Sequence, residues 1–169
     1  MHGSQADTAS ALAPVDRERL LTALRSAAPG LDLIVEAESQ RPYECDALSL
    51  YRQLPLLTAL PATVDQVQAV LRVCNALAVP AVARGAGTGL CAGAMPHPEG
   101  VLLVLSKLDR ILAIDADARS ARVQPGVANL AISRAAAAHG LYYAPDPSSQ
   151  IACTIGGNVA ENSGGVHCL

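Results

Sequence analysis

The sequence has no phenylalanine and no tryptophan, and the four tyrosines are its only aromatic residues. A hydrophobic core has to be built from aliphatic side chains, which the 51% content of apolar residues supplies. Lysine is equally scarce, since Lys107 is the only one and 15 acidic residues outnumber the 12 basic ones. The basic surface that nucleic-acid binding requires is missing, so we expect no nucleic-acid partner.

Long apolar runs and paired cysteine motifs are missing as well. No apolar stretch approaches the roughly 18 residues that span a bilayer, and the N-terminus lacks the basic and apolar regions of a signal peptide. The five cysteines are odd in number, scattered and without a C-x-x-C pair, which argues against a disulfide framework and a zinc site. We expect a cytoplasmic protein without a metal, for which peripheral attachment to a membrane stays open.

The first half of the chain combines a helical pattern with a β-α-β pattern. "DRERLLTALRSAAPG" (16–30) places its leucines on one stripe and predicts a helix, and "LLTAL" (56–60) predicts a strand. Thr63 and Gln66 then have the spacing of a capping box in front of a helical apolar pattern. "AVAR" (81–84) predicts a second, buried strand, which completes a β-α-β unit.

A glycine-rich loop, "RGAGTGLCAGAMPHPEG", follows this strand at once and holds five glycines between Gly85 and Gly100. No lysine follows a glycine as a P-loop requires, and the nearby prolines exclude the helix that a Rossmann fingerprint opens. What remains is a loop whose backbone N–H groups form a nest for an anion, with Arg84 nearby as a positive charge. A tight structural connection for the loop and a surface ion pair for Arg84 stay open as alternatives.

The second half begins with β patterns and continues with a helix. "GVLLVLS" (100–106) predicts a buried strand, and "ILAIDADARSARVQPG" (111–126) predicts an antiparallel hairpin. "NLAISRAAAAHG" (129–140) predicts a helix with Asn129 as its N-cap and Gly140 just beyond its end. The architecture therefore changes from parallel to antiparallel after the first of these strands.

A second segment poor in bulky side chains closes the sequence. In "TIGGN", Thr154 is expected to cap a short helix whose first turn holds Gly156 and Gly157, so that unpaired N–H groups face a phosphate or a carbonyl. Upstream, Pro145 and Pro147 hold the chain extended. Two such segments, far apart in the sequence, suit an elongated anionic dinucleotide better than a lone phosphate.

These motifs together resemble a known family. "RGAGTGL", the hairpin and "HGLYYAPDPSSQIACTIGGNVAENSGG" are similar to the PCMH-type FAD-binding domain of the vanillyl-alcohol oxidase and p-cresol methylhydroxylase superfamily. Within it, the likeness is greatest to the FAD-binding D subunits of glycolate oxidase and the related D-lactate and D-2-hydroxyglutarate dehydrogenases. The resemblance implies an α+β fold, with a β-α-β first subdomain followed by an incomplete antiparallel-sheet second subdomain.

The resemblance also implies a cofactor, FAD, and the residues that hold it. Thr88 stands where some members carry a histidine that attaches FAD covalently, so we expect non-covalent FAD. His97, His139 and His167 are expected to be structural, and we expect no catalytic residue in this chain. The implied cofactor contacts are Arg84, Gly85, Ala86, Gly87, Thr88, Gly89, Leu90, Pro145, Asp146, Pro147, Ser148, Cys153, Thr154, Gly156, Gly157, Asn158, Asn162, Ser163 and Gly165.

The function implied by the resemblance is the FAD-binding part of a flavoprotein that oxidises a small 2-hydroxy acid, such as glycolate or D-lactate, to the 2-oxo acid. Residues 1–41 would form an N-terminal helical extension, and residues 42–169 the FAD-binding domain, truncated at its C-terminal side. We expect this piece to be inactive alone. We also expect it to bind partner subunits of an oxidase complex in the full-length enzyme, or to self-associate through exposed apolar surface. A non-catalytic FAD-binding module completed by a partner chain and a ligand-free remnant remain as alternatives.

Overall fold

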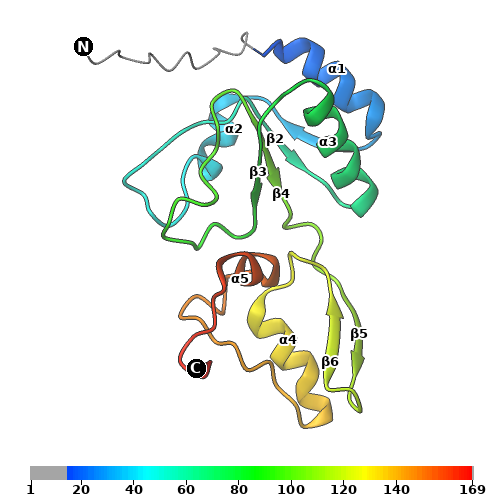
Figure 1. Cartoon of the computed structure of the whole chain (residues 1–169), viewed down its shortest axis with the longest axis vertical. Helices are drawn as coiled ribbons and strands as arrows, with labels where there is room; N and C mark the ends of the chain where they lie inside the picture. The colour runs from blue at the N-terminus through cyan, green and yellow to red at the C-terminus, as the bar shows by residue number, and fades with distance from the viewer. Residues whose placement is uncertain (1–14, 169) are drawn as a thin grey trace, which may run out of the picture.

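The computed structural model describes residues 15–168, which form two parts lying one above the other (Figure 1). The first part, up to Leu105, contains helices and a mixed sheet, and the second contains a hairpin and two helices. The first part comprises α1 (Arg17–Ala27), β1 (Asp32–Ile34), α2 (Ala37–Gln40), the 3-10 turn η1 (Arg41–Tyr43), β2 (Leu57–Leu60), α3 (Val64–Ala76), β3 (Ala81–Arg84) and β4 (Val101–Val104). The second part comprises β5 (Ile111–Asp115), β6 (Ser120–Val123), α4 (Asn129–Ala136), the 3-10 turn η2 (Ala137–His139) and α5 (Ile155–Glu161).

The capping-box spacing marks the start of α3 as predicted. Thr63 Oγ1 accepts a hydrogen bond from the Gln66 N–H at 3.2 Å, and Gln66 Oε1 accepts one from the Ala62 N–H at 2.8 Å. Two backbone donors of the helix start are thereby satisfied by the two side chains that define the motif. The helix ends through Ala78, whose left-handed backbone lets the Val79 N–H reach the Cys74 carbonyl at 2.8 Å.

The sheet of the first part has the strand order β1-β2-β4-β3. β2 and β3 both pair with β4 in parallel, so that Thr58 and Val82 lie on either side of Leu102, while β1 runs antiparallel at the β2 edge. The predicted β-α-β unit is confirmed, with β4 inserted between its two strands. This places the carboxyl ends of three parallel strands at one edge of the sheet.

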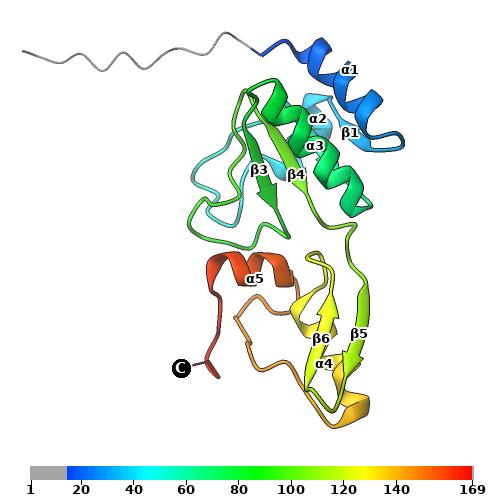
Figure 2. The same ribbon diagram turned by 45° about the vertical axis from the view of Figure 1, so that its right-hand side comes forward.

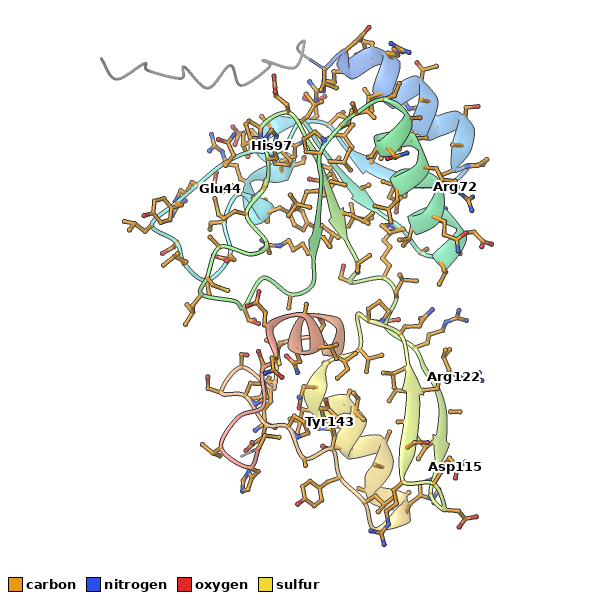
Figure 3. The ribbon with its side chains drawn as sticks, viewed as in Figure 1. Glu44, Arg72, His97, Asp115, Arg122 and Tyr143 are labelled. Atoms are coloured by element: carbon orange, nitrogen blue, oxygen red, sulfur yellow. The ribbon has the colours of Figure 1, made fainter. Side chains whose placement is uncertain are left out.

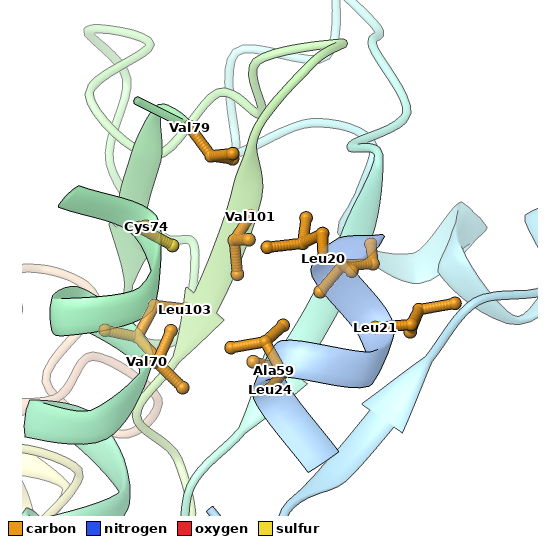
Figure 4. Packing of buried hydrophobic residues seen from close by; sticks show 10 residues of the cluster. Leu20, Leu21, Leu24, Ala59, Val70, Cys74, Val79, Val101 and Leu103 are labelled. Carbon is orange, nitrogen blue, oxygen red and sulfur yellow. The ribbon is translucent and has the colours of Figure 1, made fainter. Parts of the chain in front are cut away.

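The core of the first part lies between the sheet and the helix pair α1 and α3 (Figure 4). Leu20 and Leu24 of α1, Val70 of α3 and Val101 of β4 are each at most 1% exposed. The expected N-terminal extension therefore shares this core through α1 and β1, while its residues 1–14 lie outside the described residues, as does Leu169. The division of the chain at residue 41 stays a prediction.

In the second part, the hairpin and the helix after it form as predicted, but the helix start differs. Ala128 is the N-cap of α4, and Asn129 is its first helical residue. The prediction of Asn129 as the cap is wrong because its side chain is buried and donates from Nδ2 to the Pro145 carbonyl at 2.9 Å. At the other end, Gly140 has a left-handed φ of 68°, as expected after a helix.

The chain crosses from one part to the other near Leu105 and later returns, so that α5 lies between the two (Figure 2). A close packing at Gly126 fixes the crossing, because a Cβ there would lie 2.5 Å from the Leu105 carbonyl oxygen. The combination of a mixed sheet, a small antiparallel sheet and helices confirms the predicted α+β class. No helix within residues 15–168 is long and apolar enough to cross a membrane.

Candidate cofactor-binding cleft

A cleft lined by residues of the glycine loop and of α5 lies at the junction of the two parts. Figure 2 shows α5 between the two parts. The loop leaves β3 at the carboxyl edge of the parallel strands, where α/β sheets bind ligands. The cavity has a volume of about 160 Å³. Complete small-molecule sites measure roughly 300–1,000 Å³, so this cavity is smaller than a complete site for a dinucleotide.

Both predicted glycine segments contribute to the walls of this cleft. They face each other across it, as expected if they share one ligand. The predicted contacts that line the cleft are Gly85, Ala86, Gly87, Thr88, Gly89, Cys153, Thr154, Gly157, Asn158 and Ser163. The lining residues that sequence reasoning missed are Asp46, Ala83, Gly93, Ala94, Ser149, Ala160 and Glu161.

The two walls touch where the loop leaves β3. A Cβ on Gly85 would overlap Thr154 Oγ1, so the loop backbone packs directly on the residue that precedes α5. At the other end of α5, Cys91 Sγ and Glu161 Oε2 are hydrogen-bonded at 2.8 Å. A Cβ on Gly93 would lie 2.7 Å from Glu161 Oε1, so this end is also closely packed. Small residues are needed along the loop because the opposite wall is so close.

The start of α5 differs from the prediction of several unpaired N–H groups. The Ile155 N–H donates to the Val127 carbonyl at 2.8 Å, and the Gly156 N–H donates to the Pro125 carbonyl at 2.9 Å. Gly156 packs on Pro125, because a Cβ would lie 2.8 Å from the proline Cβ. The second part therefore uses these donors to anchor α5, and Gly157 is the first-turn glycine that faces the cleft.

Two polar side chains of this wall are buried in the cleft lining without a partner. Thr154 is the N-cap residue of α5, yet its side chain makes no capping bond and its Oγ1 is buried and unpaired. Asn158 is 6% exposed, and its Nδ2 is likewise buried and unpaired. A buried polar atom without a partner costs stability. A ligand with acceptor oxygens would supply the missing partners.

Arg84 does not line the cleft. Its side chain is 7% exposed, and Nη1 donates to the Cys45 carbonyl at 2.8 Å on the far side of the loop. Burial lowers the pKa of the guanidinium. The expectation that Arg84 contacts a ligand stays a prediction, and the structure places its side chain outside the cleft lining.

In the "PDPSS" stretch, Ser149 lines the cleft, and the four residues before it lie outside the lining. The Asp146 N–H donates to the Gly164 carbonyl at 2.8 Å, and Gly165 packs so closely on Asp146 that a Cβ would overlap it. The backbone N–H and the ring of His167 bind the Asp146 carboxylate and lower its pKa. The predicted contacts found outside the lining are Arg84, Leu90, Pro145, Asp146, Pro147, Ser148, Gly156, Asn162 and Gly165.

The histidines of the described chain lie away from the cleft lining. His97 accepts a hydrogen bond from the Glu99 N–H at 3.1 Å and lies far from α5 (Figure 3). His139 ends the turn η2, and His167 is paired with Asp146 at 2.7 Å. The structural roles expected for these three residues fit these positions.

Comparisons with known proteins agree with this geometry. A family model described as the FAD binding domain matches residues 55–169. Glycolate oxidase subunit GlcD of Escherichia coli strain K12 is 62% identical over 94% of this chain and 32% of its own length. D-2-hydroxyglutarate dehydrogenase of Xanthomonas citri pv. viticola is 37% identical over 88% of this chain and 32% of its own length. This chain thus spans about a third of the length of these relatives.

Solved structures share the fold at low identity. An alkyldihydroxyacetonephosphate synthase superposes with a TM-score of 0.77 at 18% identity, covering 90% of this chain and 33% of that one. The p-cresol methylhydroxylase structure gives a TM-score of 0.60 at 22% identity, covering 76% of this chain and 27% of that one. These likenesses establish the architecture. With a matching family model over most of its length, the chain belongs to the FAD-binding domain family, whose cofactor is FAD.

Proposed function

We propose that this chain is the cofactor-binding portion of a flavoprotein that oxidises a small 2-hydroxy acid, of the glycolate or D-lactate type, to the 2-oxo acid. The supporting observation is that a relative called glycolate oxidase subunit GlcD is 62% identical over 94% of this chain. Partner subunits of an oxidase complex belong to the same proposal.

The residues present fit FAD. The glycine loop offers backbone N–H groups without side chains in front of them, and the buried Thr154 hydroxyl and Asn158 amide lack partners that phosphate or hydroxyl oxygens could supply. We propose that the cleft-lining residues of the two segments contact the cofactor, and that the predicted residues outside the lining hold those segments in place. When bound, FAD supplies the acceptor for the electron pair that leaves the alcohol carbon.

We propose that FAD is bound without a covalent bond. Thr88, at the position of the attachment histidine in some relatives, lines the cleft with a hydroxyl that is a weak nucleophile. Cys153 is 3% exposed and Cys91 is engaged with Glu161. Acid precipitation should release all flavin into the supernatant, and flavin that stays with the protein would contradict this assignment.

We propose further that this chain alone does not oxidise the substrate. Oxidation of an alcohol carbon needs a base for its hydroxyl proton, and no histidine among residues 15–168 lines the cleft. Its lining carboxylates, Asp46 and Glu161, are respectively buried and engaged with Cys91. Turnover of glycolate or D-lactate by the purified chain with an artificial electron acceptor would contradict this proposal.

The test of the proposal is FAD binding by the purified 169-residue chain. Titration followed by flavin fluorescence should show saturable binding, and the Gly85→Val variant, which fills the contact between loop and α5, should bind much more weakly. The control is Ala27→Val, an enlarged side chain at an exposed position of α1 outside the cleft lining. A chain that stays colourless and binds no FAD would overturn the proposal.

A further inference from the structure

The segment Tyr43–Ala47 packs against the glycine loop, and its Asp46 also lines the cleft, although the segment precedes the region matched by the family model, which begins at residue 55. The Ala47 N–H donates to the Gly89 carbonyl at 3.1 Å, and the Cys45 carbonyl accepts the hydrogen bond from Arg84. The Tyr43 ring centroid is 5.8 Å from Arg84 Cζ, within the range of a cation–π contact. This segment, which we call the brace, thus contacts the loop at Arg84 and at Gly89.

The loop folds over the Arg84 side chain. Gly87 has a φ of +73°, and a Cβ there would overlap Arg84 Nη2. The Gly87 backbone thus lies against the guanidinium of Arg84. Only glycine adopts this backbone conformation easily and also leaves room for the guanidinium. Arg84 is therefore enclosed between the loop, whose other face lines the cleft, and the brace.

The charge of Arg84 has no carboxylate partner within 4.0 Å among residues 15–168. The charged groups that line the cleft in this part of the chain are the carboxylates of Asp46 and Glu161, without a lysine or an arginine. Burial lowers the pKa of Arg84, and the Asp46 carboxylate is near enough to raise that pKa in part but forms no ion pair with the guanidinium. A buried charge is costly unless it is paired. An anion in the cleft would lie one layer of backbone away from the guanidinium.

We propose that Arg84 and the brace form a positioning device for the cofactor diphosphate, in which Arg84 shapes the loop and attracts the diphosphate through it without touching it. This inference rests on the proposed function, because it assumes that the cleft binds a diphosphate. It assigns a role in cofactor binding to Tyr43, Cys45 and Ala47. In a poorly solvated site, a charge at this short range is worth far more than in water.

Hydrogen exchange of the chain without ligand tests the shaping role. In Arg84→Lys, which keeps the charge but cannot reproduce the guanidinium geometry, amides of residues 85–90 should exchange about tenfold faster. Peptides covering β4 should be unchanged, which shows that the fold is retained. The control is Arg72→Lys, an exposed arginine on α3 (Figure 3). Unchanged exchange in the loop, or faster exchange throughout the chain, would overturn the shaping role.

Binding of FAD, ADP and riboflavin tests the charge. In Arg84→Met, binding of FAD and ADP should weaken about tenfold and binding of riboflavin, which has no phosphate, by less than about threefold. Arg84→Lys should recover most of the ADP binding. Equal losses for riboflavin and ADP, or an ADP loss that lysine does not reduce, would overturn the electrostatic role. A wild-type chain that binds none of the three would refute the proposed function instead, and the exchange measurement would still decide the shaping role.

Discussion

The two parts of the molecule differ in how much core each has of its own. In the first part, all four residues of β4 are buried, and α1 and α3 cover the sheet. In the second part, neither strand of the hairpin has a fully buried residue, and Leu112 is 47% exposed. Two-stranded hairpins are marginally stable unless they pack on something else. The first part is therefore the stable scaffold, and the second depends on its contacts with α4 and with the first part.

A small hollow on the second part shows the same difference. It has a volume of about 80 Å³ and lies between the hairpin and the segment from α4 to Tyr143, with Ile114, Ala121 and Ile132 among its lining residues. In the cluster around Val101 in the first part, the buried side chains are at most 6% exposed. In a closely packed core, removing a single methylene group lowers stability, whereas side chains around an open hollow can be replaced at a smaller cost.

A leucine pair gives the largest expected contrast between the two parts. Leu102→Ala in β4, at a fully buried position, should lower the free energy of unfolding by about 3 kcal/mol, because it leaves a cavity in close packing. Leu112→Ala in β5 should cost less than about 0.5 kcal/mol. Urea denaturation followed by circular dichroism measures both. Similar losses in the two variants would show that the second part is as tightly packed as the first.

The junction between the parts should be the next most sensitive place. Gly85→Ala should weaken FAD binding by at least about tenfold, because the new methyl group pushes the loop away from Thr154. Ala27→Val, at an exposed position of α1 outside the cleft lining, should change the affinity by less than about threefold. Isothermal titration calorimetry gives both values, and an unaffected Gly85→Ala would mean that the parts need not touch to bind FAD.

The exclusion of water from the core of the first part can be measured through the pH dependence of stability. Burial raises the pKa of the Cys74 thiol from its ordinary 9.0 to about 11. Above pH 9 the unfolded chain ionises first, so the thiol's contribution is complete below pH 9 and is lost between pH 9 and 11. By pH 10 the loss should reach about 1 kcal/mol. Denaturation across this pH range in the wild type and in Cys74→Ala tests the prediction. If the free energy of unfolding fell with pH equally steeply in both proteins, the thiol would not lie in a dry core.

Two unpaired threonine hydroxyls provide the smallest and most selective contrast. Thr154→Val at the junction should raise the stability of the ligand-free chain by about 0.5 kcal/mol, because an unsatisfied buried oxygen is removed, and should weaken FAD binding. Thr58→Val, with an equally unpaired hydroxyl inside the first part, should stabilise without changing FAD binding. Thermal unfolding and FAD titration of both variants measure this, and an FAD affinity that Thr154→Val leaves unchanged would refute the assignment of Thr154 to the cofactor.

The sequence predicted the elements well because their signals are local. Apolar spacing and the Thr63 cap located α3, and the buried run of β4 and the hairpin were read from periodicity. The glycines located both walls of the cleft. The motifs also outline the cleft beyond the residues that were predicted. Glu161 and Ser149, which line it, lie inside the motifs "ENSGG" and "APDPSS".

What could not be predicted depends on contacts between distant residues. Asn129 looks like an N-cap, but the approach of the Pro145 carbonyl gives its side chain a different partner. The α5 donors are taken by carbonyl groups from residues 125 and 127, which no spacing rule reveals. Asp46 has no motif of its own, and its place in the cleft follows from the pairing of Ala47 with Gly89.

The position of β4 between β2 and β3 also has a consequence for the order of folding during synthesis. A nascent chain that has emerged only as far as Arg84 can pair β1 with β2, but β3 has no partner, because it pairs with β4, which is not yet made. The sheet can close only after Val104 has left the ribosome. The ribosome therefore delivers the whole glycine loop before the scaffold that fixes its conformation exists.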